Sequence, residues 1–145
     1  MEAGANMKVI IVGCGRVGSR LTLQLAREGN EVAVIDRNPL AFDKLNGIFD
    51  GNMVVGTGID EDVLASAGIH DADAVISVAK GDNTNIMVGQ IAKILFRVPK
   101  VIIRISDPKS KKFYEEEMGL TCYCPTETSS QHCLGFLEGG APPCM

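Results

Sequence analysis

Tryptophan is absent from this 145-residue chain, and all aromatic residues together make up 5% of it. So few aromatic rings argue against a surface on which nucleic-acid bases stack. Basic residues are not in excess either, because 14 lysines and arginines stand against 18 aspartates and glutamates, for a net charge of −4. Such a chain lacks the basic surface that binds a phosphate backbone. We therefore expect no nucleic-acid partner.

A long apolar run and a secretory leader are also lacking. No stretch of 18 apolar residues occurs, so no segment is expected to span a bilayer. Residues 1–6 are neither basic nor hydrophobic, which favours a leader or a cloning remnant before Met7 over a secretory signal. Without a signal, the five cysteines are expected to stay reduced in the cytoplasm. At this length we expect one domain, too short for a two-domain dehydrogenase.

Residues that would form a catalytic centre are scarce. The chain has two histidines, and neither pairs recognisably with a nucleophile, so we expect a protein that is not an enzyme. Cys122, Cys124, His132 and Cys133 match no common zinc spacing, which favours buried structural thiols over a metal site. Cys14 is either a redox-sensitive thiol with a lowered pKa at a helix N-terminus or a small residue that fills a turn.

What the chain does contain is a regular alternation of apolar strands and helices. Strands are predicted at Lys8–Val12, Glu31–Ile35, Asn52–Val55, Ala74–Val78, Lys100–Ile105 and Thr121–Tyr123. Helices are predicted at Arg16–Glu28, from Asn38-Pro39 onward, at about Asp60–Ala67, at Asn83–Phe96 and from Asp107-Pro108 to Gly119. This alternation predicts an α/β fold: a Rossmann-like, doubly wound, parallel six-stranded sheet of strand order 3-2-1-4-5-6 in a single domain.

We place this domain at residues 7–126. Residues 127–145 are expected to form a short helix over Glu127–Glu138, with Thr126 as its cap, and then a frayed tail. On the preceding helix, Lys111–Glu115 and Lys112–Glu116 have the spacing of ion pairs on a solvated face.

The first strand runs directly into a glycine-rich turn of the G-x-G-x-x-G pattern. Gly13 would permit the tight turn, Gly15 would let a pyrophosphate approach the backbone, and Gly18 would let the helix pack closely. The main-chain amides of Arg16 and Val17 would then face the phosphates at the positive end of the helix dipole. The alternative is a glycine turn with only a structural role.

Asp36 ends the second strand, 18 residues beyond Gly18. A carboxylate at this separation accepts hydrogen bonds from the ribose hydroxyls of a dinucleotide. It also repels a 2′-phosphate, which favours NAD or ATP over NADP. Arg37, the neighbouring cation, weakens this preference and is counted with the nucleotide-binding residues.

Two further loops are candidates for the same site. After the fourth strand, Val78, Ala79, Lys80 and Asn83 would hold a phosphate or the distal ribose; alternatively, Asp82 or Asn83 only caps the next helix. After the third strand, Thr57 and Gly58 would line the adenine end, or they form only a flexible turn.

Taken in order, these segments resemble the KTN/RCK (TrkA-N) nucleotide-binding domain of Trk- and Ktr-type potassium-uptake regulators. The resemblance rests on the residues at 9–18, 32–39, 54–64, 68–76, 81–86, 101–108 and 124–126. It implies a non-enzymatic domain that binds NAD, NADH, ATP or ADP. It also implies a homodimer, often assembled into a ring, on the cytoplasmic face of the cell membrane beneath a potassium transporter or channel subunit.

The resemblance extends to individual residues. It implies that Arg16 lies by the phosphates and senses their number at a dimer interface. Arg104 would face the same crevice, or it is an arginine satisfied at a strand end. Thr57 stands where many members carry an acid. We expect the C-terminal regulatory subdomain of longer members to be absent, since few residues follow Thr126. The competing hypothesis is a small NAD-dependent oxidoreductase or a fragment of one.

Overall fold

Six parallel strands form the central sheet of the computed structural model, which describes residues 6–139. They are β1 (Lys8–Val12), β2 (Glu31–Asp36), β3 (Asn52–Val55), β4 (Ala74–Ser77), β5 (Lys100–Arg104) and β6 (Thr121–Tyr123). Their order is β3-β2-β1-β4-β5-β6, and each neighbouring pair is parallel. The predicted Rossmann-like sheet is therefore confirmed. The chain switches direction across the sheet between β1 and β4, the point at which such sheets bind ligands.

Helices connect the strands. They are α1 (Arg16–Arg27), the 3₁₀ helix η1 (Pro39–Leu45), α2 (Glu61–Ser66), the 3₁₀ turn η2 (Ile69–Asp71), α3 (Asp82–Gln90), the π-helical turn η3 (Ile91–Leu95), α4 (Pro108–Met118) and α5 (Pro125–Leu137). Asn38, Asp60 and Asp107 begin three of them, each accepting a hydrogen bond from the main-chain N–H two residues later. These caps explain why the predicted starts of η1, α2 and α4 hold.

The helix predicted at Asn83–Phe96 divides into α3 and η3. Its last turn widens to a π-helix, closed by a hydrogen bond from the Phe96 N–H to the Ile91 carbonyl at 3.2 Å. Arg97 then takes a φ of +53°. The chain thus leaves the helix before Pro99, which cannot continue it.

The prediction for α5 was wrong at its start. The helix begins at Pro125 rather than Glu127, and Thr126 is not its cap. Cys124 occupies the N-cap position without a side-chain hydrogen bond. Proline favours the first helical position because its φ is already helical and it has no N–H to leave unpaired.

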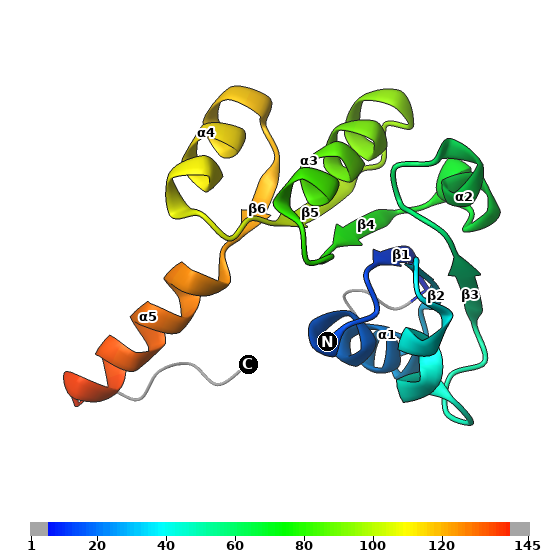
Figure 1. Cartoon of the computed structure of the whole chain (residues 1–145), viewed down its shortest axis with the longest axis horizontal. Helices are drawn as coiled ribbons and strands as arrows, with labels where there is room; N and C mark the ends of the chain where they lie inside the picture. Colours follow the sequence, from blue (N-terminus) through cyan, green and yellow to red (C-terminus); the bar gives the residue numbers. More distant parts are fainter. Residues whose placement is uncertain (1–5, 140–145) are drawn as a thin grey trace.

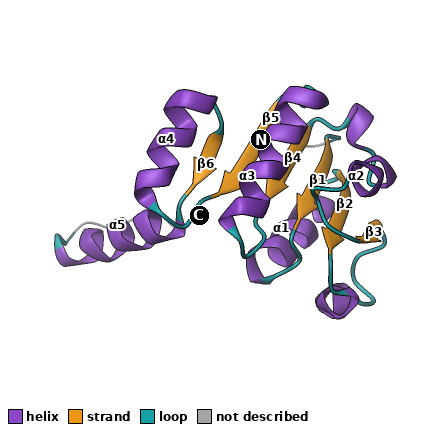
Figure 2. Ribbon diagram, turned by 45° about the horizontal axis from the view of Figure 1, so that its top comes forward, coloured by secondary structure: helices purple, strands orange, loops and turns teal. Residues whose placement is uncertain are grey.

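Strand residues alternate between two buried clusters, one on each face of the sheet. On one face, α2, α3 and α4 cover a cluster that includes Ile10, Ile35 and Ile103 (Figure 2). On the other, α1 and η1 cover Val9 and Ile11. Burial on both faces is why the strands read as runs of valine and isoleucine.

The outer strands β5 and β6 are buried more on one face than on the other. Val101 and Ile103 are buried under α3, whereas Ile102, Arg104 and Tyr123, which point to the side of α1, are half-buried. The carboxyl end of β5 therefore carries an arginine that solvent still reaches.

Helix α5 extends away from the sheet and buries none of its residues (Figure 1). Two contacts join its first turn to the body: Thr126 Oγ1 donates to the Ser106 carbonyl at 3.2 Å, and Glu127 pairs with Lys111 of α4 at 3.1 Å. Within residues 6–139, none of the helices is long and apolar enough to cross a membrane. Residues 1–5 of the leader predicted at 1–6, and residues 140–145 of the predicted tail, lie outside the described residues.

Candidate nucleotide site

The glycine turn after β1 and the loop after β4 lie against each other at the carboxyl edge of the sheet. Gly13 has a φ of +101°, and a Cβ built on it would lie 2.9 Å from the Ala79 nitrogen. The Val78 N–H donates to the Val12 carbonyl at 2.8 Å, which fastens the start of this loop to β1. The two loops that the sequence nominates are thus brought together at the switch point.

Gly18 and Gly15 differ in what surrounds them. A Cβ on Gly18 would lie 1.7 Å from the Gly13 carbonyl oxygen, so glycine is required for α1 to pack on the turn. A Cβ on Gly15 would meet nothing within 4 Å. Gly15 is also the N-cap of α1, and no side chain caps the helix there. The first amides of a 12-residue helix therefore face open space, an arrangement that fits a phosphate group.

Asp36 is held rigidly beside this turn. Its Oδ2 accepts from the Cys14 N–H at 2.7 Å, and its Oδ1 accepts from the Asn38 N–H at 2.9 Å. The side chain is half-buried at the end of β2. Since each carboxylate oxygen has a second lone pair, both can still accept a hydrogen bond from a ribose hydroxyl.

Lys44 also reaches the turn, although it was not among the residues predicted to line the site. Its Nζ donates to the Cys14 carbonyl at 3.3 Å from η1, 30 residues away along the chain. No local motif marks this lysine, because the packing of η1 against α1 brings it there.

The thiol of Cys14 is buried, and burial raises its pKa. The hypothesis of a lowered pKa at the helix N-terminus is therefore wrong. Desolvation of the thiolate outweighs the attraction of Lys44, and the charge of Asp36 raises the pKa further.

The loop after β3 is placed at the same edge, where the Gly56 N–H donates to the Asp36 carbonyl at 2.9 Å. Gly58 is buried, and a Cβ on it would lie 2.7 Å from Val12 Cγ1 and 3.0 Å from Val88 Cγ2. Its lack of a side chain thus serves packing against β1 and α3. Thr57 is half-buried, and its hydroxyl accepts from the Ile59 N–H at 3.4 Å.

In the loop after β4, neither Asp82 nor Asn83 caps α3, because Gly81 holds the N-cap position. Both carboxylate oxygens of Asp82 accept from the Ser106 N–H at 3.0 Å instead. Val78 is buried and Ala79 half-buried, and Asn85, which the sequence analysis did not select, is fully buried beside them. The exposed residues among the predicted nucleotide-binding residues are Gly15, Arg16, Val17, Arg37, Lys80 and Asn83.

Arg104 ends β5 at this same edge. It is half-buried, and its buried Nε has no hydrogen-bond partner within the described part of the chain. The alternative was that every nitrogen of this strand-end arginine has a hydrogen-bond partner within the protein. The Nε atom contradicts it.

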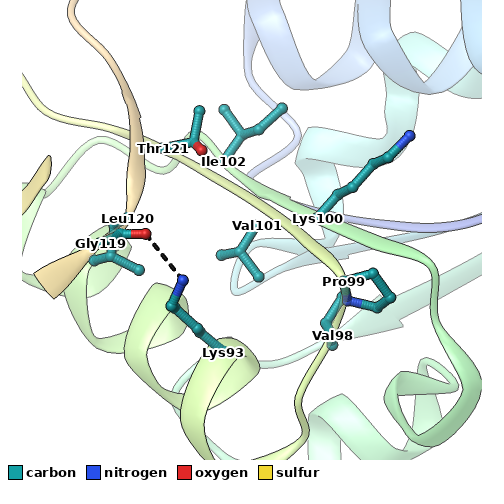
Figure 3. A pocket seen from close by; sticks show the side chains of 9 residues that line it. All are labelled: Lys93, Val98, Pro99, Lys100, Val101, Ile102, Gly119, Leu120 and Thr121. Carbon is teal, nitrogen blue, oxygen red and sulfur yellow. Dashed lines mark hydrogen bonds between the residues drawn. The ribbon is translucent and has the colours of Figure 1, made fainter.

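A metal centre and surface hollows away from this edge are the other kinds of site to consider in the described residues. Among residues 6–139, no three His, Cys, Asp or Glu side chains gather as metal ligands would. A surface hollow of about 260 Å³ lies at the amino ends of β5 and β6. Figure 3 shows the residues that line it. There Lys93 Nζ donates to the Gly119 carbonyl at 2.9 Å. This hollow contains none of the predicted nucleotide-binding residues.

Comparison with known proteins identifies relatives by sequence. Residues 9–122 match the model of the TrkA-N domain. The Trk system potassium uptake protein TrkA of Streptomyces coelicolor is 41% identical over 138 residues, covering 94% of this chain and 61% of that protein. Its namesake from Vibrio alginolyticus is 37% identical over 103 residues, covering 71% and 22%. The chain thus spans only part of each relative. These relatives are named as potassium uptake proteins and not as enzymes, which agrees with the expectation that this chain is not an enzyme.

Solved structures share the fold at lower identity. The TrkA-N domain of the inner membrane protein YbaL from Escherichia coli has a TM-score of 0.78 at 21% identity, covering 91% of this chain and 97% of that one. The AMP-bound C-terminal domain of Kef from Shewanella denitrificans has a TM-score of 0.70 at 22% identity, with 85% and 74% covered. The NAD-bound GsuK channel has a TM-score of 0.68 at 19% identity, with 83% and 22% covered. By its sequence match and its strand order, this chain belongs to the TrkA-N domain family.

Proposed function

We propose that this domain binds an adenine nucleotide, NAD(H) or ATP/ADP, across the carboxyl edge of its sheet. The observation that carries the proposal is the open space above Gly15, where the uncapped amides of α1 lie beside the fixed carboxylate of Asp36. Fold neighbours support it, since a Kef domain is described bound to AMP and GsuK bound to NAD.

In this proposal different residues of the chain bind different parts of the nucleotide. The amides at the start of α1 bind the phosphates, with Arg16 beside them. Asp36 accepts the ribose hydroxyls and disfavours a 2′-phosphate. Arg37 and Thr57 lie toward the adenosine, while Ala79, Lys80, Asn83 and Arg104 lie toward the far end of the ligand.

The proposed role is regulation by binding rather than turnover. The matched relatives are named potassium uptake proteins, so the domain would act on a membrane potassium transporter or channel subunit from its cytoplasmic side. It would do so as a homodimer, alone or within a ring. Nucleotides can change the gate only through different affinities for two conformations of the assembly.

The test is calorimetric titration of the full chain with AMP, ADP, ATP, NAD+ and NADH. We expect at least one of them to bind. Asp36→Ala should weaken that binding about 10- to 150-fold, since a hydrogen bond to a charged group is worth about 1.5–3 kcal/mol. Asp50→Ala, at an exposed acid just before β3, is the matched control and should bind as the wild type does.

Arg16→Ala tests the phosphate-sensing role within the same titrations. It should reduce any difference in affinity between ATP and ADP, whereas Arg27→Ala at the other end of α1 should preserve it. An unchanged ratio in Arg16→Ala contradicts the role. Sustained oxidation or reduction of nicotinamide in the presence of candidate substrates would favour the oxidoreductase hypothesis instead.

A further inference from the structure

Asn85, in the first turn of α3, uses every hydrogen-bonding group of its side chain. Its Oδ1 accepts from the Ser77 hydroxyl at 2.7 Å and from the Ala79 N–H at 2.9 Å. Its Nδ2 donates to the Ala79 carbonyl at 2.8 Å and to the Arg104 carbonyl at 3.1 Å. The side chain is fully buried, and an amide has two donors and two acceptor positions, so all four are satisfied.

These bonds join the carboxyl ends of β4 and β5 to the start of α3. The strand ends are thereby fixed relative to each other by one amide rather than by strand pairing alone. Ala79 takes part in two of the bonds, one donated by its N–H and one accepted by its carbonyl. Its nitrogen lies 2.9 Å from the position of a Cβ built on Gly13 of the glycine turn. Asn85 therefore sets where the loop after β4 lies relative to the end of β5.

Arg104 is held by its main chain through the same amide. Its side chain carries the buried Nε that lacks a hydrogen-bond acceptor within residues 6–139. A cationic donor in this state is prepared for an acceptor such as a phosphate or carboxamide oxygen. The position of that donor depends on where Asn85 holds the end of β5.

A doubly wound sheet of this order is built from two mononucleotide-binding halves, here β1–β3 and β4–β6. Asp36 lies in the first half, whereas Ala79 and Arg104 lie in the second. We propose that Asn85 is a positioning residue for the second half-site. It orients Ala79 and Arg104 toward the second mononucleotide of a dinucleotide and does not touch the ligand itself.

This inference rests on the proposed nucleotide binding and predicts a specific difference between ligands. AMP occupies only the first half, so its affinity should not depend on Asn85. NAD+ extends into the second half, so its affinity should. A merely structural asparagine would change both affinities alike, or neither.

The test compares AMP and NAD+ binding to the full chain and to Asn85→Asp by calorimetry. This substitution keeps the shape and the two acceptors but places an oxygen against the carbonyls of Ala79 and Arg104. We expect the Kd for NAD+ to rise about tenfold or more, while the Kd for AMP changes less than about twofold.

Asn30→Asp is the matched control at the opposite edge of the sheet. Asn30 is also buried, accepting from the Met7 N–H and donating to the Leu25 carbonyl, each at 3.0 Å. Its substitution should lower stability comparably and leave the ratio of the two Kd values unchanged.

The outcomes separate the two proposals. If the wild type binds none of AMP, ADP, ATP, NAD+ and NADH, the proposed function fails, and this inference fails with it. If the wild type binds another of these nucleotides but not NAD+, only the inference is overturned. If the wild type binds both AMP and NAD+ but Asn85→Asp leaves the ratio of the Kd for NAD+ to the Kd for AMP unchanged, only the inference is overturned. Should Asn85→Asp not fold, Ser77→Ala removes a single bond to the same oxygen. It should then raise the ratio roughly two- to threefold, and an unchanged ratio overturns the inference.

Discussion

At the scale of single residues, three glycines of one turn have three different reasons to be glycine. Gly13 adopts a left-handed backbone, Gly18 makes room for the Gly13 carbonyl, and Gly15 leaves space that no protein atom fills. The first two requirements belong to folding and the third to the proposed ligand. Substitution can therefore separate stability from binding within six residues.

Gly18→Ala should destabilise the fold by about 1–3 kcal/mol or more, because its Cβ would lie 1.7 Å from a backbone oxygen. Gly15→Ala should cost less than about 1 kcal/mol, the difference between glycine and alanine at an N-cap, yet weaken nucleotide binding. Urea denaturation and calorimetry measure the two effects. Equal destabilisation by both variants would contradict this division.

The buried thiol of Cys122 makes the stability of the fold depend on pH. Burial raises its pKa from 9.0 to about 11, and the negative charge of Glu115 adds to the effect. The folded chain therefore retains the thiol proton at pH values where the unfolded chain has lost it. Stability from this source is complete below about pH 9 and is lost as the pH rises toward 11.

The free energy of unfolding should accordingly fall between pH 9 and pH 11, with at most about 2 kcal/mol of the fall due to Cys122. Cys122→Ala should make this fall shallower, whereas Cys133→Ala, at an exposed thiol on α5, should not. Urea denaturation at pH 8 and pH 10.5 measures it. The same fall in wild type and Cys122→Ala would show that the thiol contributes nothing.

At the scale of elements, Lys111 joins α4 to α5. The sequence predicts for this lysine only an ion pair within α4. Lys111 pairs with Glu115 at 3.4 Å, as the spacing predicts, but also with Glu127 of α5 at 3.1 Å. The hydrogen bond to Glu127 is the main reason that the pKa of Lys111 is raised. The pair predicted between Lys112 and Glu116 is not found among the described residues.

Lys111→Gln should loosen the first turns of α5 with little loss of global stability, since ion pairs that solvent reaches contribute little to it. Amide hydrogen exchange over residues 126–130 should become roughly two- to fivefold faster, while exchange in α1 stays the same. Lys112→Gln is the control on the neighbouring residue. Unchanged exchange in α5 would mean that the ion pair does not hold this helix.

At the scale of the whole molecule, apolar groups remain uncovered. Leu134, Phe136 and Leu137 of α5 are 49%, 65% and 84% exposed, and the half-buried face of β5 and β6 carries Ile102. Exposed apolar side chains of this kind favour contact with another protein surface. They are consistent with the proposed homodimer.

Light scattering of the full chain should therefore give at least twice the mass of one chain at micromolar concentration. Apolar contacts weaken little with salt, so the mass should persist at 0.5 M NaCl. A strict monomer at high concentration contradicts both the homodimer and the ring.

Local sequence signals were enough to predict the sheet and the glycine turn between β1 and α1. Strand runs of valine and isoleucine, asparagine and aspartate caps and the glycine turn are local signals, so their positions follow from neighbouring residues. The spacing from Gly18 to Asp36 is local as well, because it spans most of α1 and the strand β2 that follows it. The placement of each predicted residue around a bound nucleotide stays a prediction.

The contacts between groups far apart in the sequence became known from the three-dimensional structure alone. The bonds of Asn85 to Ser77 and Arg104, the reach of Lys44 to Cys14 and the pairing of Lys111 with Glu127 all join segments that the sheet order brings together. The raised pKa of Cys14 also depends on tertiary packing. The position at a helix N-terminus predicts a lowered pKa, but burial of the thiol raises it. Such contacts depend on how elements dock, and no local pattern of residues encodes the distance between two side chains on different elements.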